Sequence, residues 1–463
     1  MAENERTDDK SGDSGGKPQK KLRVLLRTFG CQMNQADSEV AMGIIGESHL
    51  DAEFVEDRDT ADVILINTCS VRDHAEQRVF GLLRELKARK QKRPKRIIGV
   101  MGCMAVEYKE KLFREFPHID FICGAKDIDK LPELIDDASR NIQKAVITEE
   151  GYGVHEGKLA LRKDGVCALV PITHGCDNYC SYCIVPYVRG REISRPTEEI
   201  LDELNYLAEK GYKQIVFLGQ NVNSYGAGLK TKITFTGLLK KAAEINGIEL
   251  IEFMTSHPKD ASDELIEAMA SDPKISKHIH LPVQSGSNVI LRKMKRNYTR
   301  EAYLQIVKTL QKSVLDVSIT TDIIVGFPGE TDSDFNDTIE LMKAVPFDAS
   351  FIFKYSPRAG TEAHKLPDNV PQAEKERRNQ ALLEIQNELS AAQNSRYIGR
   401  AMKALIVQKS RKNADEFLAV TWNDKLVVVP GKGLALGNVI DVTLDELSNN
   451  TFKGTVTAIG SKK

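Results

Sequence analysis

The chain has 463 residues, with 65 basic and 66 acidic side chains, 41% hydrophobic and 28% charged residues. At about 150 residues per domain, this length predicts about three domains, and the composition is ordinary for a soluble globular protein. The absence of a window of about 18 apolar residues argues against a membrane-spanning helix, and the polar start argues against a secretory signal. We therefore expect a cytoplasmic protein, in which the eight cysteines indicate metal binding or catalysis rather than disulfides.

The amino-terminal part of the chain predicts a disordered tail followed by an α/β domain. Residues 1–20 are rich in Gly, Ser, Lys and Asp and offer nothing to bury. Over residues 21–145, apolar runs alternate with helical periodicity, which predicts a doubly wound domain with a parallel sheet. The expected strands cover residues 22–28, 62–69, 96–102 and 119–124, and the expected helices cover residues 35–48, 73–90, 106–116 and 127–141.

The alternation resumes after a loop-like stretch at residues 149–165. Six βα repeats over residues 162–394 predict a partial (β/α)6 barrel, because a closed eight-stranded barrel needs a longer chain. The expected strands cover residues 167–173, 214–219, 248–255, 277–283, 317–327 and 347–356, and the expected helices cover residues 197–210, 236–246, 260–271, 286–295, 300–312, 331–344 and 372–395. Residues 395–460 contain short strands with Gly and Asn turns, which predict a small β-barrel.

The strongest local motif is HGCDNYCSYC, which places Cys176, Cys180 and Cys183 directly after the first expected barrel strand. Three thiolates from one loop can hold a four-iron cluster and leave one iron open to a substrate or cofactor. The loop falls at the carboxyl end of a barrel strand, where active sites of β/α barrels lie. Zinc is the alternative, but zinc prefers four ligands, and His174 lies on the strand side of the loop. The motif therefore favours an iron–sulfur cluster.

A second set of cysteines is brought together by topology rather than by spacing. Cys31, Cys69 and Cys103 each end an expected parallel strand, and loops at the carboxyl ends of such strands converge on one crevice. Cys123 also ends a strand, so four ligands around a closed cluster, or zinc, remain open from the residues alone. The alternative for any one cysteine is a small buried apolar side chain. Cys167 lies within an expected strand and is assigned to the core.

The first motif, with Tyr182 before its last cysteine, resembles the radical S-adenosylmethionine superfamily. The resemblance implies that the open iron chelates the amino and carboxylate groups of S-adenosylmethionine, whose reductive cleavage yields a 5′-deoxyadenosyl radical. It also implies that FLGQN at residues 217–221 contacts the methionine part and that IVGFPGE at residues 324–330 lies near the adenine. The cofactor-binding residues so expected are Gly219, Gln220, Asn221, Gly326 and Gly329.

Within that superfamily, the chain resembles the methylthiotransferases over nearly its whole length from Lys21, in TFGCQMNQADSE (28–39), NTCSVRDHAEQRVF (67–80), GCMA (102–105), VPYVRGREISRP (185–196), HLPVQSGSNVILRKMKRNYTR (280–300), DIIVGFPGET (322–331) and FKYSPRAGT (353–361). The resemblance implies that Cys31, Cys69 and Cys103 bind an auxiliary four-iron cluster and that Cys123 is not a ligand. It therefore implies two [4Fe-4S] clusters, with S-adenosylmethionine as both methyl donor and radical source.

The segments GCQMN, NTCSVR and RGREISRP resemble the branch that converts N6-isopentenyladenosine at tRNA position 37 to its 2-methylthio derivative. The C2–H bond of adenine has no acidic proton, so its activation needs a radical, which a cofactor must supply. The auxiliary cluster is the implied donor of the sulfur. The implied partners are the tRNA anticodon stem-loop, a reductant such as flavodoxin or ferredoxin, and sulfur or iron–sulfur delivery proteins, with no membrane partner.

The expected RNA-binding segment is the carboxyl-terminal β region, which resembles the TRAM domain. Residues 396–463 carry eleven Lys or Arg against six Asp or Glu, and small basic β-barrels suit loop RNA. The alternative is a solvated charged face. The candidate RNA contacts are Arg396, Arg400, Lys403, Lys409, Arg411 and Lys412.

Three other functions stay open as alternatives: methylthiolation of threonylcarbamoyl-adenosine in tRNA, methylthiolation of a ribosomal-protein aspartate, and a non-catalytic RNA-binding protein with zinc. The basic β region disfavours the protein substrate, which needs no polyanion binder. No catalytic role beyond cluster binding is assigned, because His257, His280 and Glu330 are as readily structural as acid–base residues.

Overall fold

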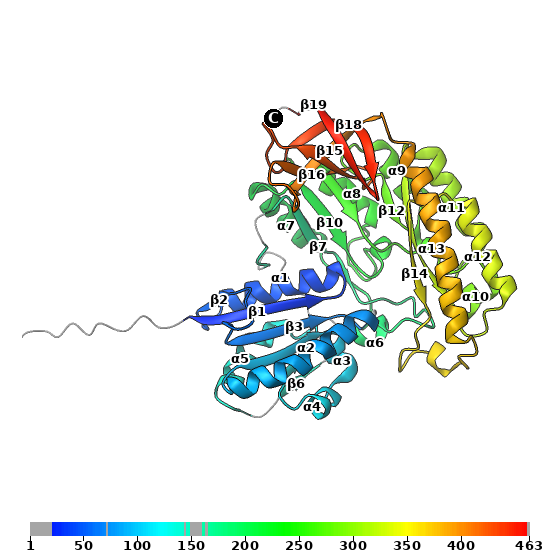
Figure 1. Cartoon of the computed structure of the whole chain (residues 1–463). Helices are drawn as coiled ribbons and strands as arrows, with labels where there is room; N and C mark the ends of the chain where they lie inside the picture. The colour runs from blue at the N-terminus through cyan, green and yellow to red at the C-terminus, as the bar shows by residue number, and fades with distance from the viewer. Residues whose placement is uncertain (1–20, 71–72, 143–144, 149–159, 163–164, 461–463) are drawn as a thin grey trace, which may run out of the picture.

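The computed structural model describes residues 21–70, 73–142, 145–148, 160–162 and 165–460. The tail expected at residues 1–20 and most of the loop expected at residues 149–165 lie outside this part of the chain. Figure 1 shows three bodies: an amino-terminal sheet, a central half-open barrel and a small carboxyl-terminal barrel. None of the described helices combines the length and apolar composition needed to cross a bilayer.

The amino-terminal body is a six-stranded parallel sheet in the order β2-β1-β3-β4-β5-β6. Its elements are β1 (Leu22–Phe29), α1 (Gln32–Gly46), β2 (Ala52–Phe54), β3 (Val63–Thr68), α2 (Asp73–Lys92), β4 (Ile97–Gly102), α3 (Cys103–Tyr108), α4 (Lys111–Glu115), β5 (Phe121–Cys123), η1 (Ile128–Lys130), α5 (Leu131–Ser139) and β6 (Ala145–Ile147). Every residue of β3 and β4 is buried, because helices α2–α4 cover one face and α1 and α5 the other. The doubly wound fold is confirmed.

The structure differs from the sequence expectation in three local details. The helix expected at residues 106–116 is two helices, α3 and α4, separated at Lys109, whose φ is 45°; this left-handed conformation interrupts a helix. Strands β2 and β6 were not expected, since each has three residues and neither contains a buried residue. Helix α1 begins directly after Cys31 rather than at residue 35.

The central body is a partial barrel of six parallel strands, as expected. Two three-stranded sheets, β7-β10-β11 and β12-β13-β14, are linked by the bridge between Ile251 and Ile275. The elements are β7 (Cys167–Pro171), β8 (Thr173–His174), α6 (Val185–Val188), β9 (Ile193–Ser194), α7 (Thr197–Glu209), β10 (Gln214–Leu218), η3 (Val222–Ser224), α8 (Phe235–Ala243), β11 (Leu250–Phe253), η4 (Pro258–Asp260), α9 (Asp263–Ser271), β12 (His278–His280), α10 (Asn288–Lys293), α11 (Arg300–Ser313), β13 (Ser318–Val325), α12 (Asp332–Ala344), β14 (Ala349–Lys354), η5 (Ala363–Lys365) and α13 (Gln372–Ser395).

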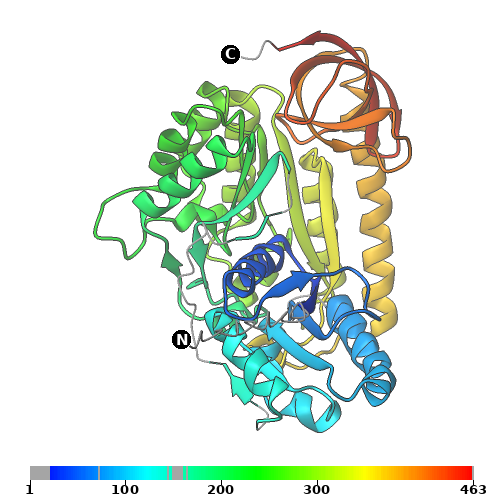
Figure 2. The same cartoon turned by 90° about the vertical axis from the view of Figure 1, so that its left-hand side faces the viewer.

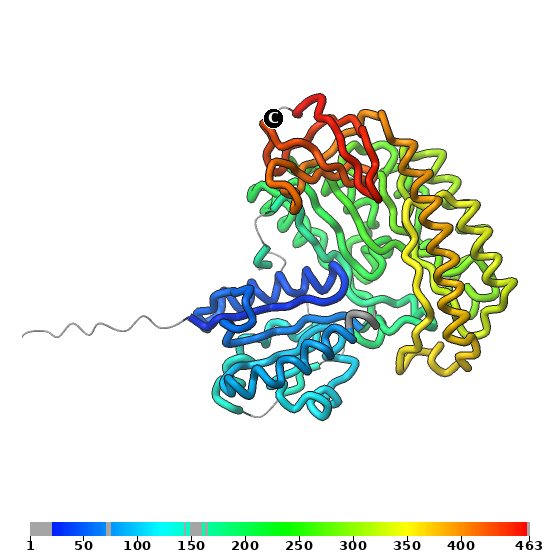
Figure 3. The backbone as a smooth tube through the Cα atoms, in the orientation of Figure 1, coloured from blue at the N-terminus to red at the C-terminus, as the bar shows by residue number. Residues whose placement is uncertain are grey.

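Side-chain alternation along the barrel strands separates an outer core from an inner surface. Ile215 and Phe217 of β10 pack in the core beneath the helices, so Val216 and Leu218 point inward. There they contact Met33 of α1, which belongs to the amino-terminal body. Figure 3 traces α1 between the amino-terminal sheet and the barrel strands. The inner surface of the barrel is therefore lined on one side by a helix of the neighbouring body.

The carboxyl-terminal body is a closed barrel with strand order β15-β16-β17-β19-β18, which is the expected architecture. Its strands are β15 (Ala401–Lys409), β16 (Glu416–Thr421), β17 (Leu426–Pro430), β18 (Val439–Ser448) and β19 (Thr451–Ile459). Figure 2 shows this barrel as a ring at the end of α13. Its Trp422 packs with Val166 and Leu250, and Lys277 N donates to Trp422 O over 2.6 Å. It thus sits at the amino ends of the central strands, opposite the cysteine loops.

Candidate iron–sulfur and cofactor site

The first cysteine triplet lies in the loop between β8 and α6, at the carboxyl ends of the barrel strands. Cys183 N donates to Cys180 O over 2.9 Å, which folds the loop back on itself. Burial, followed by the negative charges of Cys180 and Cys176, raises the pKa of Cys183 to about 12. The three sulfur atoms are therefore electrostatic neighbours, and a bound cation is what would favour their thiolate forms.

Two polar side chains contact sulfur atoms of this first triplet. Asn178 Nδ2 donates to Cys176 Sγ over 3.4 Å, and Arg296 Nη1 donates to Cys180 Sγ over 3.4 Å. Arg296 is buried, and its remaining nitrogens donate to Tyr298 and to Pro282 O. Buried charges need a partner, and a thiolate is the one anion that these contacts offer to Arg296.

The second triplet stands where three adjacent strands of the amino-terminal sheet end. Cys31 follows β1, Cys69 follows β3, and Cys103 follows β4, in the strand order β1-β3-β4. The loops approach so closely that a Cβ atom on Gly30 would lie 2.5 Å from Cys69 Cβ, and Gly30 has a φ of +135°. Glycine is therefore needed beside the triplet.

The three thiols of the second triplet interact directly. A hydrogen bond with Cys69 is the main cause that lowers the pKa of Cys31 and of Cys103, and the positive charge of Arg189 lowers both further. The same hydrogen bonds raise the pKa of Cys69. Cys31, Cys69 and Cys103 are therefore electrostatic neighbours at one edge of the sheet.

Cys123 stands apart from this group. Its thiol donates to Asp127 O over 3.2 Å, and its side chain packs in the core on the α1 and α5 face of the sheet, with Ile128 and Leu131. Burial raises its pKa. Cys123 therefore packs in the core on one face of the sheet, and it does not contribute to the electrostatic group formed by the second triplet.

The two triplets lie on elements that face each other. Cys103 and Val106 of α3 form one apolar cluster with Ile184 and Val188, which flank and end α6. Arg189, the next residue, donates from Nε to Cys103 Sγ over 3.2 Å. The loop that contains the first triplet therefore leads directly into the side chains that surround the second.

The donor set of each triplet suits a four-iron cluster. Among the described residues, no three His, Cys, Asp or Glu side chains are drawn together as ligands of a single metal ion. Three cysteine thiols are the donor set that, by residue type, would leave one iron of a four-iron cluster open.

Buried polar atoms without a partner gather beside the first triplet. Among the described residues, Thr173 Oγ1, Gln220 Oε1, Asn221 Oδ1 and Ser256 Oγ have no hydrogen-bond partner. They follow or belong to strands β8, β10 and β11. A Cβ on Gly219 would collide with Thr173 Oγ1, so only glycine fits at this position. Unpaired buried polar atoms call for a ligand or water, and these suit the polar groups of an amino-acid cofactor.

The two other expected cofactor residues, Gly326 and Gly329, lie in a turn that follows β13. Both have positive φ, 70° and 75°, and a Cβ on Gly326 would collide with the Lys375 side chain of α13. Glu330 accepts from Gly326 N over 2.6 Å and from Arg378 over 2.8 Å. Glu330 therefore holds this glycine turn, which is a structural role.

The histidines considered at the sequence level also have defined surroundings. Burial lowers the pKa of His257 to about 2, and its Nδ1 accepts from Lys259 N. His280 Nδ1 lies 3.0 Å from Thr320 Oγ1, and its Nε2 lies 3.5 Å from Asp322. Cys167 was wrongly assigned to the core: it is exposed, because it is the first residue of β7 and lies at the rim of the barrel.

The expected RNA contacts fall into two groups. Arg400 forms an ion pair with Asp316 at 2.6 Å, and Lys403 Nζ lies 4.8 Å from the Trp422 ring centre, so both are engaged near the junction with the central barrel. Arg396 is exposed and bonds to Gln393. Lys409, Arg411 and Lys412 are exposed around the β15–β16 loop.

Two aromatic side chains that the sequence did not single out line the inner face of β14. Phe351 and Phe353 are 53% and 40% exposed, while Ile352 between them packs against the helix-facing core. Their register partners are Asp322 and Ile324 of β13. These phenyl rings share the open barrel interior with Cys31, which packs against the inward residues of β7 and β10.

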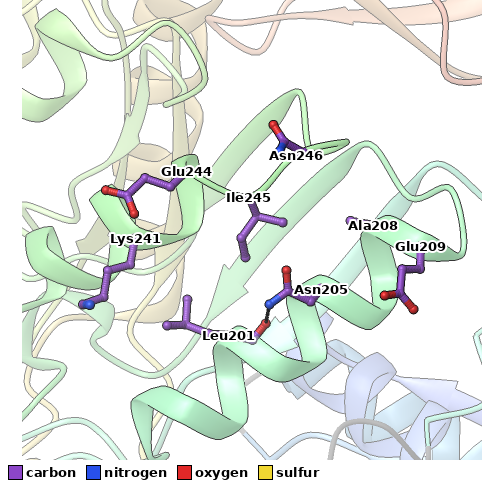
Figure 4. Close-up of a pocket in the computed structure, with 8 residues that line it drawn as sticks. All are labelled: Leu201, Asn205, Ala208, Glu209, Lys241, Glu244, Ile245 and Asn246. Atoms are coloured by element: carbon purple, nitrogen blue, oxygen red, sulfur yellow. Dashed lines mark hydrogen bonds between the residues drawn. The ribbon is translucent and has the colours of Figure 1, made fainter. Parts of the chain in front are cut away.

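A surface hollow of about 480 Å³ between α7 and α8 is lined by Glu209, Lys241 and Glu244, among others. Figure 4 shows that these side chains line the hollow between the helices and that Asn205 bonds to Leu201. The hollow is on the outer surface of the barrel, so it is not part of the site.

Comparison with known families and proteins agrees with this geometry. Residues 170–342 match the Radical SAM superfamily, and residues 23–124 match the uncharacterized protein family UPF0004. The chain is 44% identical over 440 residues to the tRNA-2-methylthio-N(6)-dimethylallyladenosine synthase of Clostridium novyi, covering 94% of this chain and 96% of the relative. It is 45% identical over 433 residues to the protein of the same name from Caldicellulosiruptor saccharolyticus, covering 93% and 91%.

Solved structures show the fold at greater distance. The radical S-adenosylmethionine methyltransferase TsrM from Kitasatospora setae, with cobalamin and a [4Fe-4S] cluster bound, aligns with a TM-score of 0.52 at 12% identity, over 72% of each chain. The same enzyme with tryptophan and a SAM analogue aligns with a TM-score of 0.51 at 13% identity, over 72% of this chain and 73% of that one. These alignments show a shared fold over 72% of this chain.

Proposed function

This chain belongs to the family of tRNA-2-methylthio-N(6)-dimethylallyladenosine synthases, radical SAM enzymes, and from this membership we propose that it converts N6-isopentenyladenosine at tRNA position 37 to its 2-methylthio derivative. The observation that carries the proposal is identity of 44% extending over 94% of the chain. It favours this substrate over threonylcarbamoyl-adenosine and over a protein aspartate, and it makes the chain an enzyme rather than a zinc-containing RNA-binding protein.

We assign Cys176, Cys180 and Cys183 to the cluster that works with S-adenosylmethionine, and Cys31, Cys69 and Cys103 to an auxiliary cluster. When bound, these groups supply an electron for radical chemistry and a place for the sulfur, which activate a C–H bond that has no acidic proton. The chain would hold both clusters in one interior. Helices α3 and α6 pack against each other, and the loops after β7, β10 and β11 would shield the clusters from solvent.

The unpaired polar atoms suggest how the chain orients S-adenosylmethionine. Gln220 Oε1 and Ser256 Oγ are acceptors for an ammonium group, while Thr173 Oγ1 can donate to a carboxylate. Asn221 is fixed through its Nδ2, which donates to Asp260 over 2.7 Å. These contacts would place the methionine part beside the first triplet.

We further assign the inner face of β14 to the substrate base. Phe351 and Phe353 offer an exposed apolar wall opposite Cys31, suited to an adenine ring with a prenyl group. Stacking on an aromatic side chain contributes about 1–3 kcal/mol per base. An adenine in an anticodon loop must leave its stack to reach such a wall, as in other base-modifying enzymes.

Phe353→Ala is expected to weaken binding of a prenylated anticodon stem-loop by about tenfold, since stacking on the base and apolar contact with the prenyl group together lose about 1.4 kcal/mol. Binding of the same RNA without the prenyl group should change less. Fluorescence anisotropy with both RNAs measures the two constants. Leu315→Ala, at an apolar residue that is 82% exposed outside the barrel interior, is the matched control. Equal weakening for both RNAs would contradict the assignment.

The exposed basic residues of the β15–β16 loop are assigned to tRNA phosphates. Changing Lys409, Arg411 and Lys412 together to Gln should weaken binding uniformly across tRNA sequences and lower the salt slope of log Kd by up to about three, one for each phosphate that is no longer neutralised. Lys241→Gln, at an exposed lysine on the outer barrel surface, should leave the slope unchanged. A triple variant that keeps the native slope would remove this loop from the RNA interface.

The remaining partners follow from the chemistry. The radical step needs a protein reductant such as flavodoxin or ferredoxin, and the auxiliary site needs sulfur or iron–sulfur delivery proteins. Both are partners found in the cytoplasm, where tRNA is modified.

Mass spectrometry of nucleosides from a deletion strain tests the proposed function. We expect loss of 2-methylthio-isopentenyladenosine with accumulation of isopentenyladenosine, restored by the plasmid-borne gene. A deletion strain with an unchanged 2-methylthio level would disprove the assignment, and accumulation of unmethylthiolated threonylcarbamoyl-adenosine would redirect it to the other nucleoside.

A further inference from the structure

Arg189 is a buried arginine that links the two cysteine triplets. Its side chain is 3% exposed and follows α6, the helix just after the first triplet. Nε donates to Cys103 Sγ over 3.2 Å, and Nη2 donates to Asp37 Oδ2 over 2.7 Å. The Asp37 side chain of α1 has no exposed surface. One guanidinium therefore joins the loop of the first triplet to a ligand of the second.

Burial of the Arg189 guanidinium costs desolvation free energy unless neighbouring anions balance its charge. A buried guanidinium needs anions and good hydrogen-bond geometry to offset its desolvation. Asp37 supplies one negative charge, and a Cys103 thiolate supplies the other partner. Nη1 is buried and has no hydrogen-bond partner within the described residues. Among the residues that the structure describes, Arg189 Nη1 is therefore a free donor beside the expected iron–sulfur cluster, whose sulfur atoms can accept a hydrogen bond.

Arg296 offers an internal comparison at the other triplet. It also donates to a cysteine sulfur, Cys180 Sγ, over 3.4 Å. Its other acceptors are Pro282 O and the Tyr298 hydroxyl, which are neutral. Each triplet thus has one buried arginine on one of its sulfur atoms, and the arginine at the second triplet differs in forming an ion pair with a buried carboxylate, that of Asp37.

We propose that Arg189 is a positioning residue for the auxiliary cluster, which holds the Cys103 ligand through a two-point guanidinium clamp with Asp37 and sets the reduction potential of that cluster. The proposal rests on the proposed function, which places a cluster at Cys31, Cys69 and Cys103. Hydrogen bonds to cluster sulfur and local net charge set such potentials. A positive charge stabilises the reduced, more negative form, so Arg189 makes the auxiliary cluster easier to reduce.

The test is a redox titration of reconstituted full-length protein followed by electron paramagnetic resonance. Arg189→Gln keeps hydrogen-bond donors but removes the charge, and it should move the midpoint of the auxiliary signal to more negative potential while the other signal stays in place. Arg296→Gln is the matched control: it should shift the midpoint of the first-triplet signal and leave the auxiliary signal in place. Full-length protein with Cys176, Cys180 and Cys183 changed to Ala identifies the auxiliary signal.

Two further variants keep the proposal falsifiable if Arg189→Gln folds poorly. Arg189→Lys keeps the charge but loses the fork geometry, so it should retain most of the native potential yet lose iron from the auxiliary site only. Asp37→Asn removes the neutralising carboxylate and should shift the auxiliary midpoint in the positive direction.

An unshifted auxiliary midpoint in Arg189→Gln at full iron content would overturn the proposal. So would equal loss of both clusters from Arg189→Lys together with a lower melting temperature, since this is what a purely structural residue produces. A wild-type protein that binds about four rather than about eight iron atoms would instead contradict the two-cluster assignment itself. The two failures are therefore distinguishable.

Discussion

Cys176→Ala is expected to abolish the release of 5′-deoxyadenosine from S-adenosylmethionine, with a loss of at least about 100-fold. The variant removes one of three thiols that one loop supplies, and a loss of even supporting partners of a metal site typically costs about 10–100-fold. Chromatography of reactions with dithionite and S-adenosylmethionine, without tRNA, measures the product.

Cys167→Ala is the matched control for this experiment, because Cys167 is exposed and belongs to neither triplet. It should form deoxyadenosine at the wild-type rate. If Cys176→Ala still produced deoxyadenosine at more than about a tenth of that rate, the first triplet would not be the site of cleavage.

Cys69→Ala is expected to separate the two halves of the reaction. Cys69 follows β3, the middle strand of the three that end at the second triplet, so its removal should empty the auxiliary site and lower iron from about eight to about four atoms per chain. Deoxyadenosine should still form in part, whereas the methylthio nucleoside should fall below detection. Iron analysis and mass spectrometry of the same sample measure both.

Cys123→Ala belongs to the same sheet but removes a cysteine that packs in the core. It should keep full iron content and methylthio product, apart from a loss of stability of order 1 kcal/mol from the small cavity. Equal loss of both activities in a correctly folded Cys69 variant would refute the division of labour between the triplets.

The sequence predicted most of the fold because each buried strand is a short apolar run between helices of matching period. The ends of β3, β10 and β13 were predicted to within about two residues. Edge strands β2 and β6 escaped this reasoning, since three partly exposed residues have no periodic signal. The break between α3 and α4 depends on one left-handed residue, Lys109, for which lysine gives no sequence warning.

The part of the candidate site that depends on strand order could be predicted from the sequence. Parallel strand order alone places Cys31, Cys69 and Cys103 at one sheet edge. Arg189 and Arg296 were missed, because a loop arginine usually faces solvent and their contacts with Cys103 and Cys180 connect residues 86 and 116 positions apart. Alternation along β14 identifies Phe351 and Phe353 as sharing one face, but only the unclosed barrel leaves that face accessible.

The central barrel has two free edges, since β7 and β14 are each paired on one side only in the described sheets. A ring of strands closed all round would admit a molecule only through its mouth, and a folded polynucleotide is too wide for that route. The free edge at β14 leaves Phe351 and Phe353 exposed, so under the proposed function a single base could reach them from the side of the barrel. Under the proposed function, residues along this free edge would select the macromolecule, while the cysteine triplets at the strand ends would hold the groups that do the chemistry.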